Sequence, residues 1–498
     1  MNAPRRLALR TLLGWLFLAP SLLRAGPDPA AGSPSAPAEA PKGFFECDSP
    51  LPDPGGLRAR LADRGVALGL IYTGEVFGNP AGGYRQGAVY NGLVTAGLDI
   101  DFGKLLGWDG LRFHAITYET HGANGTNLYT RDLNFYSSIN AYDSIRLSEI
   151  WLQQSFFGNA VNLRVGQEEV DAEFATTIGG ALFIHSNFGA LPTLTLNVPT
   201  PTYPEAAPAV RLRLNSPHGH LYFQAGVYAG NANADRDGDP APGFRAGTSY
   251  NDDGTRFPIS GNQGLLSLYE AGYLLNYRKE DPGLPGAYRV GGFYHTGDFS
   301  DEFLLSADPY LTAAPMAVRP RVHGGNGGFY AVAEQVLYRP HHPGGGNEDV
   351  ATSAAAPIGN AEDSPLGLNG VPPPAGAQLR VFGRLGIGQG DRSLTDFYAE
   401  AGLNYRALLP GRDQDVLGVG FTYTSLSDAA RRLVHDADRF AGTRTRTPDY
   451  EGVFEVTYQA NLAPWLSVQP DLQYLVHPGG SPRYGNALVL GVRTVVTF

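Results

Sequence analysis

Residues 92–102 read GLVTAGLDIDF, and apolar side chains alternate along them with polar or small ones. Val94 and Ile100 fall on one face of an extended chain, whereas Asp99 and Asp101 fall on the other. Successive side chains of a β-strand point to opposite faces, so this period of two predicts a strand with one apolar face.

The same alternation recurs from residue 66 to the end of the chain, in segments separated by turn-forming residues. The sixteen predicted strands lie near 66–78, 92–104, 110–121, 147–157, 160–168, 207–215, 220–231, 264–277, 286–298, 328–339, 378–389, 396–406, 415–425, 450–460, 465–477 and 486–498. An even number of antiparallel strands is typical of a closed bacterial outer-membrane barrel. Alternation alone leaves a soluble all-β protein open as an alternative.

Three further features favour the membrane. The last strand, GNALVLGVRTVVTF at 485–498, ends on Phe498, which resembles the signal read by the barrel-insertion machinery of Gram-negative outer membranes. Short turns alternate with long loops at 169–206, 232–263 and 299–327, and aromatic residues gather near strand ends. We therefore expect an all-β fold, a 16-stranded antiparallel transmembrane β-barrel, because only closure satisfies every backbone group in lipid.

Composition excludes several other classes of protein. Gly and Pro, 65 and 38 of 498 residues, make up about a fifth of the chain, which disfavours a bundle of long helices. The single cysteine, Cys47, excludes a disulfide scaffold. A formal net charge of −11 indicates no nucleic-acid partner, and no clustered ligands indicate a metal or other cofactor.

The N-terminal region predicts export. Residues 1–25 have a positive start and an apolar run of about 12 residues, which is typical of a signal peptide and short of the ~20 that a membrane-spanning helix needs. Residues 26–56 read as a flexible Pro/Ala-rich periplasmic leader, and 57–498 as the barrel, with a short helix near 57–62. The stretch 340–377 has the composition of a disordered periplasmic insert.

Polar side chains should face the lumen, because a charge on the lipid face near the midplane costs about 2–4 kcal/mol. In strands 110–121 and 328–339 the pattern is ambiguous and we assign neither. The side chains predicted to line a path for solute are Glu75, Glu149, Trp151, Gln153, Arg164, Arg211, Arg213, Tyr222, Arg380, Phe382, Arg384 and Glu455. This mixture suits sugars, since rings offer apolar platforms and charged groups offer donors and acceptors. The plainer interpretation is that these groups only solvate a water-filled pore.

The loop at 169–206 is long and unusually apolar for an exposed connection. We expect it to fold into the barrel and to form the constriction of the pore, because its aromatic side chains would then leave water. The residues predicted to form that constriction are Asp171, Glu173, Phe174, His185 and Phe188.

Several motifs, in this order, resemble the OprB-type carbohydrate-selective porins. They include YTGEVFGNPAGGYRQGAVYNG (72–92), RLSEIWLQQSFF (146–157), LRVGQEEVDAEF (163–174), LNYRALLPGRDQDVLGVGFTYT (403–424) and YEGVFEVTYQANLAPWLSVQPDLQYLVHPGG (450–480). The resemblance covers nearly all of residues 57–498. It implies a 16-stranded outer-membrane barrel that passes small sugars such as glucose down their concentration gradient. The sequence leaves both a monomer and a homotrimer open among outer-membrane lipids, because no strand has an apolar excess that indicates a trimer face.

Three other functions compete with a sugar channel. An enzyme is disfavoured, because the sequence has neither a G-x-S-x-G nor an H-E-x-x-H motif. A receptor-type active transporter would need a plug domain, for which the region before the first strand is too short. A general diffusion porin without sugar selectivity remains the main alternative.

Overall fold

The computed structural model describes residues 49–232, 251, 253–257, 259, 263–277, 281, 283–300, 322–339, 377–432, 435, 448–481 and 483–498. The predicted signal peptide, the predicted leader up to residue 48 and residues 340–376 of the predicted insert lie outside the described residues. Among the described residues, none of the helices is long and apolar enough to cross a bilayer.

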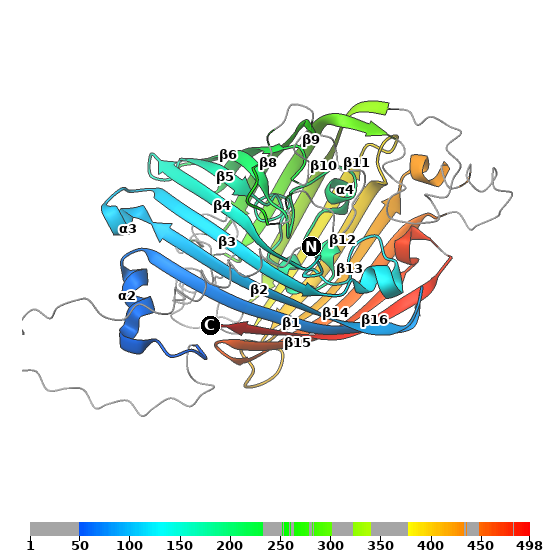
Figure 1. Cartoon of the computed structure of the whole chain (residues 1–498), viewed down its shortest axis with the longest axis horizontal. Coiled ribbons are helices and arrows are strands. Elements are labelled where there is room, and N and C mark those ends of the chain that lie inside the picture. Colours follow the sequence, from blue (N-terminus) through cyan, green and yellow to red (C-terminus); the bar gives the residue numbers. More distant parts are fainter. Residues whose placement is uncertain are drawn as a thin grey trace, which may run out of the picture. The chain divides into compact units, whose positions relative to one another are not determined.

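Sixteen antiparallel strands form one closed barrel, in which each strand pairs with its neighbours in sequence and β16 pairs with β1. In Figure 1 the blue strand β1 lies beside the red strand β16, where the barrel closes. The strands are β1 (Val66–Gly83), β2 (Gly87–Asp101), β3 (Leu111–Gly122), β4 (Ser144–Phe156), β5 (Val161–Glu168), β6 (Ala207–Asn215), β7 (Leu221–Ala229), β8 (Leu265–Leu275), β9 (Gly286–Ser300), β10 (Val322–Tyr338), β11 (Gln378–Gly388), β12 (Thr395–Arg406), β13 (Val416–Leu426), β14 (Tyr450–Ala463), β15 (Leu466–Val476) and β16 (Gly485–Thr497). The predicted fold class is confirmed.

The two faces of each strand differ as the alternation predicts. On β6, Val210 and Leu212 are 47% and 39% exposed on the outer wall, whereas Arg211 and Arg213 are 0% and 6% exposed inside. An outer wall of this kind meets lipid, and the inner face is free to carry charge.

Two differences from the predicted strand ends have local causes. The strand predicted over 92–104 stops at Asp101, whose side chain accepts hydrogen bonds from Gly103 N and Lys104 N and so begins the helix α3 (Phe102–Leu106). β10 begins at Val322, six residues before its predicted start. The glycines of residues 322–328 indicate a turn, but this stretch pairs with β9 and so extends the strand. The predicted helix near 57–62 is α2 (Leu57–Asp63).

The remaining short elements lie in connections between strands or before β1. They are η2 (Pro54–Gly56), η3 (Thr126–Thr130), η4 (Gly180–Leu182), η5 (Ser186–Phe188), α4 (Pro192–Thr195) and η9 (Pro478–Gly480). We call the end of the barrel that carries the β2–β3, β4–β5 and β6–β7 connections the turn end, and the opposite end the loop end. The predicted alternation of short turns and long loops has exceptions at the loop end, where only residues 84–86 join β1 to β2 and only residues 389–394 join β11 to β12.

Closure between β1 and β16 needs glycine at one point of close approach. Gly82 has a φ of 71°, and a Cβ atom there would lie 1.8 Å from the carbonyl oxygen of Asn486. At the turn end, Phe498 N donates to Leu70 O at 2.9 Å, so the last residue is still held by the first strand.

Candidate functional site

Residues 169–206, which join β5 to β6 and which we call the inner loop, lie inside the barrel. Its aromatic side chains are buried, with Phe174 at 2%, Phe183 at 4% and Phe188 at 1% exposure. Phe183 stacks on Phe188 with ring centroids 4.3 Å apart, and Phe382 of β11 packs against both rings. The inner loop thus folds inward as expected, and its role as the constriction stays a prediction.

Carboxylates of the barrel wall bind the backbone of the inner loop. The hydrogen bonds are Ala175 N to Glu270 at 3.0 Å, Ile178 N to Glu334 at 3.1 Å, Ile184 N to Glu455 at 2.5 Å and His185 N to Glu455 at 3.0 Å. A backbone amide that leaves water needs a partner, and a charged acceptor gives one of the stronger bonds available. The wall therefore supplies the partners that water would give an exposed loop.

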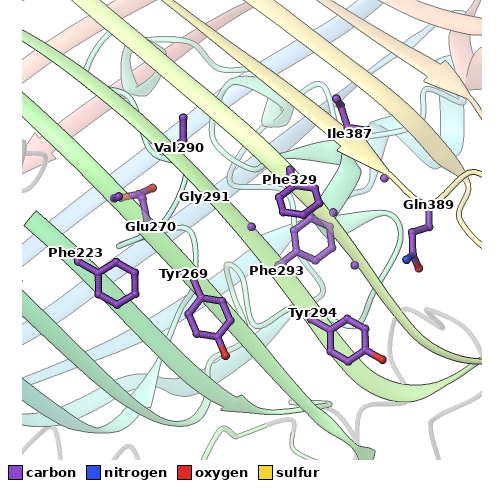
Figure 2. A pocket seen from close by; sticks show the side chains of 15 residues that line it. Phe223, Tyr269, Glu270, Val290, Gly291, Phe293, Tyr294, Phe329, Ile387 and Gln389 are labelled. Atoms are coloured by element: carbon purple, nitrogen blue, oxygen red, sulfur yellow. The ribbon is translucent and has the colours of Figure 1, made fainter.

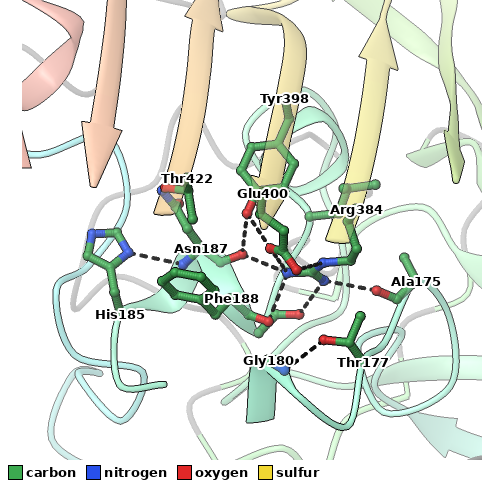
Figure 3. A network of polar contacts seen from close by, with 12 residues as sticks. Ala175, Thr177, Gly180, His185, Asn187, Phe188, Arg384, Tyr398, Glu400 and Thr422 are labelled. Atoms are coloured by element: carbon green, nitrogen blue, oxygen red, sulfur yellow. Dashed lines mark hydrogen bonds and ion pairs between the residues drawn. The ribbon is translucent and has the colours of Figure 1, made fainter. Parts of the chain in front are cut away.

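A single buried guanidinium binds both limbs of the inner loop (Figure 3). Arg384 of β11 forms two bonds of 2.7 Å to Glu400 of β12, and both side chains of this ion pair are 0% exposed. Arg384 also donates to the carbonyl oxygens of Ala175 at 2.9 Å, Asn187 at 2.8 Å, Phe188 at 2.8 Å and Gly189 at 3.1 Å. The planar guanidinium has several donors and can bind the Glu400 carboxylate and the loop carbonyls together, so Arg384 fixes the inner loop to the wall.

A second buried cluster joins β4, β5 and β6 to the beginning of the inner loop. Arg164 donates to Glu173 at 2.7 Å and to Gln153 at 3.0 Å, and Arg211 donates to Gln153 at 2.9 Å. The Arg164 guanidinium lies 3.8 Å from the ring centroid of Trp151. These contacts join the beginning of the inner loop to three neighbouring strands, so the cluster fixes the loop against the wall.

The charges around Glu173 shift the pKa of its carboxyl group. Burial raises the pKa of Glu173, but the guanidinium groups of Arg164 and Arg211 outweigh burial and hold the pKa below its ordinary value. Glu173 therefore stays ionised at neutral pH and is shared between the two arginines.

A second loop, residues 123–143 between β3 and β4, also lies inward, and we call it the brace loop. Ser138 N donates to Ile184 O at 2.8 Å, and Ser186 N donates to Phe135 O at 3.0 Å. The brace loop also contacts the wall, since Leu133 N donates to Glu451 at 2.8 Å. It therefore supports the part of the inner loop around Ile184 and Ser186 from the lumen side of β14.

Between the two loops and the wall of β14, β15, β16 and β1 lies a hollow of about 200 Å³, which we call the β14–β1 hollow. It is lined by Thr73, Ile139, Ala181, Leu182, Gln459, Gln469, Arg493 and Val495. Arg493 pairs with Glu75 at 2.9 Å, and its side chain keeps 12% exposure. The lining therefore mixes polar and apolar side chains, and its one charged side chain, Arg493, is neutralised by Glu75.

A larger hollow, of about 660 Å³, lies on the outer wall over β8, β9, β10 and β11 (Figure 2). Tyr269, Tyr294, Phe329 and Ile387 surround it, and each is 46% or more exposed. These side chains belong to the membrane-facing face of the strands, so this hollow is separate from the lumen.

Comparison with known proteins now identifies the barrel. The family described as "Carbohydrate-selective porin, OprB family" matches residues 85–366 and 367–498. The chain belongs to the OprB family. It is an outer-membrane β-barrel porin, that is, a channel and not an enzyme.

Individual proteins that the chain resembles are distant in sequence. Porin B of Pseudomonas aeruginosa is 26% identical over 469 residues, which cover 90% of this chain and 91% of that protein. "Putative porin QuiX" of Acinetobacter baylyi is 20% identical over 474 residues, 90% of this chain and 92% of that protein. The high-pH structure of Pseudomonas putida OprB has a TM-score of 0.72 at 22% identity and covers 92% of this chain and 100% of its own.

The lumen residues predicted from sequence all point into this OprB-family barrel. Those buried to 7% exposure or less are Glu75, Glu149, Trp151, Gln153, Arg164, Arg211, Arg213, Tyr222, Phe382, Arg384 and Glu455, and Arg380 is half-buried. Of the predicted constriction residues, Glu173, Phe174, His185 and Phe188 are buried and Asp171 is half-buried. Most of these side chains bind the inner loop or one another, and their predicted contact with sugar remains untested.

Sequence reasoning missed the brace loop and several wall residues that bind the inner loop. Strand β8 carries inward Leu266 and Leu268, both 0% exposed, beside inward Glu270, so both of its faces are partly apolar. The unassigned strand β10 likewise turns Val332 and Glu334 inward. The polar composition of the brace loop gave no signal for burial, because its partners come from the inner loop and from distant strands.

Proposed function

We propose that this OprB-family chain is a passive, carbohydrate-selective channel for small neutral sugars resembling glucose. The observation that carries the proposal is the local pairing of charges in the narrowed lumen. Arg164, Arg384 and Arg493 each lie within 2.9 Å of a carboxylate, so these three charges are cancelled locally while hydrogen-bonding groups remain. Such pairing weakens the attraction for anions and leaves donors and acceptors for hydroxyl groups.

Two comparisons support the same proposal. The matching family is described as carbohydrate-selective, and Porin B of Pseudomonas aeruginosa aligns along nearly its whole length. Passage requires contacts that are several but individually weak, and neutral hydroxyl contacts meet that condition.

Liposome swelling tests the proposal directly. Proteoliposomes should swell faster in glucose than in a neutral amino acid or a salt of similar size, and glucose should reduce ion current through single channels. Equal swelling rates for all solutes of equal size would support the general diffusion porin instead. The oligomeric state should be measured on the same preparation, because each pore of a trimer contributes separately to the conductance.

A further inference from the structure

The β14–β1 hollow is the part of the described lumen where polar groups face open space instead of one another. The Gln459 side chain is half-buried, lines this hollow, and makes no hydrogen bond to any of the described residues. Gln469, opposite on β15, donates to Leu182 O at 2.7 Å and to Thr457 at 2.9 Å. One amide is thus held by the protein, and the other keeps its donors and its acceptor for a solute.

Arg493 gives the hollow donors without net charge. It donates to Glu75 at 3.0 Å through Nε and to Ser138 Oγ at 3.1 Å through Nη2, and Glu75 itself is buried. A free guanidinium would favour an anion, whereas a paired one acts as a fixed hydrogen-bond donor. The electrostatics therefore favour a neutral ligand rather than a carboxylate or phosphate.

The remaining lining provides apolar contact. Ile139 of the brace loop, Leu182 of the inner loop and Val495 of β16 border the same space as the polar groups. A sugar ring has hydroxyl groups at its edge and C–H groups on its faces, so it matches both kinds of lining. The volume of about 200 Å³ is below the roughly 300–1,000 Å³ of pockets for drug-sized ligands, which limits the site to one small ring at a time.

We infer that the β14–β1 hollow is a binding subsite for one neutral, polyhydroxylated ring, contacted by Gln459, Arg493 and Leu182. This inference rests on the proposed function. It adds where the sugar binds, namely at the wall of β14 to β1 and not at the buried cluster of Arg164 and Trp151.

The test is a glucose titration of ion current through single channels in a planar bilayer, with wild type and Gln459→Ala. Loss of the Gln459 amide should raise the half-blocking glucose concentration roughly three- to tenfold, as expected for one or two hydrogen bonds. Gln459→Asn, which keeps the amide on a shorter side chain, should recover part of the block. Gln154→Ala is the matched control, because Gln154 binds only backbone carbonyls of Asp109 and Ser155 at the turn end.

The outcomes separate the two proposals. If glucose blocks the wild type and Gln459→Ala equally, the subsite is wrong although sugar selectivity stands. If glucose fails to block the wild type, the proposed function itself is wrong. Each channel must first show the heat-dependent mobility shift of a folded barrel on a gel, so that a folding defect is not mistaken for lost binding.

Discussion

The wall formed by β4 to β12 and the wall formed by β14 to β1 both hold the inner loop, the second through Glu455, but they differ in the polar groups that they leave over. On the first wall, Arg164, Arg211 and Arg384 are at most 4% exposed and bind the inner loop or its supports. On the second, Arg493 keeps partial exposure and Gln459 has no partner among the described residues. The fully buried charges therefore support the loop, whereas the half-buried Gln459 is the group that we propose a solute contacts.

The largest expected effect comes from removing Arg384, which fixes the inner loop to the first wall. Arg384→Gln leaves Glu400 buried without its cation and leaves loop carbonyls with fewer donors, a loss of about 3–5 kcal/mol for a broken buried pair. The inner loop should detach, and single-channel conductance should rise several-fold. Arg412→Gln is the control, because Arg412 lies in the β12–β13 turn and pairs with Asp415 there.

A double variant that removes both charges of the Arg384–Glu400 pair separates the role of the ion pair from that of the carbonyl contacts. The double variant Arg384→Met with Glu400→Gln removes both charges, so it should destabilise loop docking less than Arg384→Gln alone. The single-channel conductance of the double variant should therefore lie between those of the wild type and Arg384→Gln. A double variant as open as the single one would show that the carbonyl contacts, rather than the ion pair, hold the loop.

The next effect comes from the aromatic cluster that packs the loop on the same wall. Phe188→Ala removes a ring that stacks on Phe183 and contacts Phe382, and truncation of a buried Phe costs about 3 kcal/mol or more. Open-channel current noise and protease cleavage of the inner loop should increase. Phe157→Ala, at a site 85% exposed in the β4–β5 turn, should leave both unchanged.

A smaller effect is expected at Trp151, and it separates the two walls. Trp151 is 6% exposed, and its ring is stacked between His114 and the guanidinium of Arg164. Trp151→Phe keeps an apolar ring there, so the half-blocking glucose concentration should change less than twofold. A change as large as that of Gln459→Ala would place sugar contacts on the first wall and would contradict the comparison.

The smallest effect concerns pH. The pKa of Glu173 lies below its ordinary value in the folded protein, so its pairing stabilises the docked loop fully above the unfolded carboxyl pKa of about 4.3. That contribution is lost as the pH falls through the lower folded value. Conductance should therefore begin to rise below about pH 4, and Glu173→Gln should reduce the size of this rise.

Strand alternation was sufficient to predict sixteen strands and the face on which Arg211 or Trp151 lies, because both depend on a local period of two. It left the faces of β10 unassigned and gave no lumen residue on β8, because the inward face of both strands is partly apolar and packs on the inner loop instead of on water. The end of the strand predicted over 92–104 was also wrong, since the Asp101 side chain starts a helix.

By itself, the sequence determined the barrel, its strand count, its lipid-facing surface and the inward turn of the apolar inner loop. Only the tertiary structure decided which inward charges support that loop and which polar groups remain free beside the β14–β1 hollow. The reason is the distance along the chain over which the deciding contacts form. Arg384 and Ala175 are 209 residues apart, and Ile184 and Glu455 are 271 apart, so no local pattern records either pair.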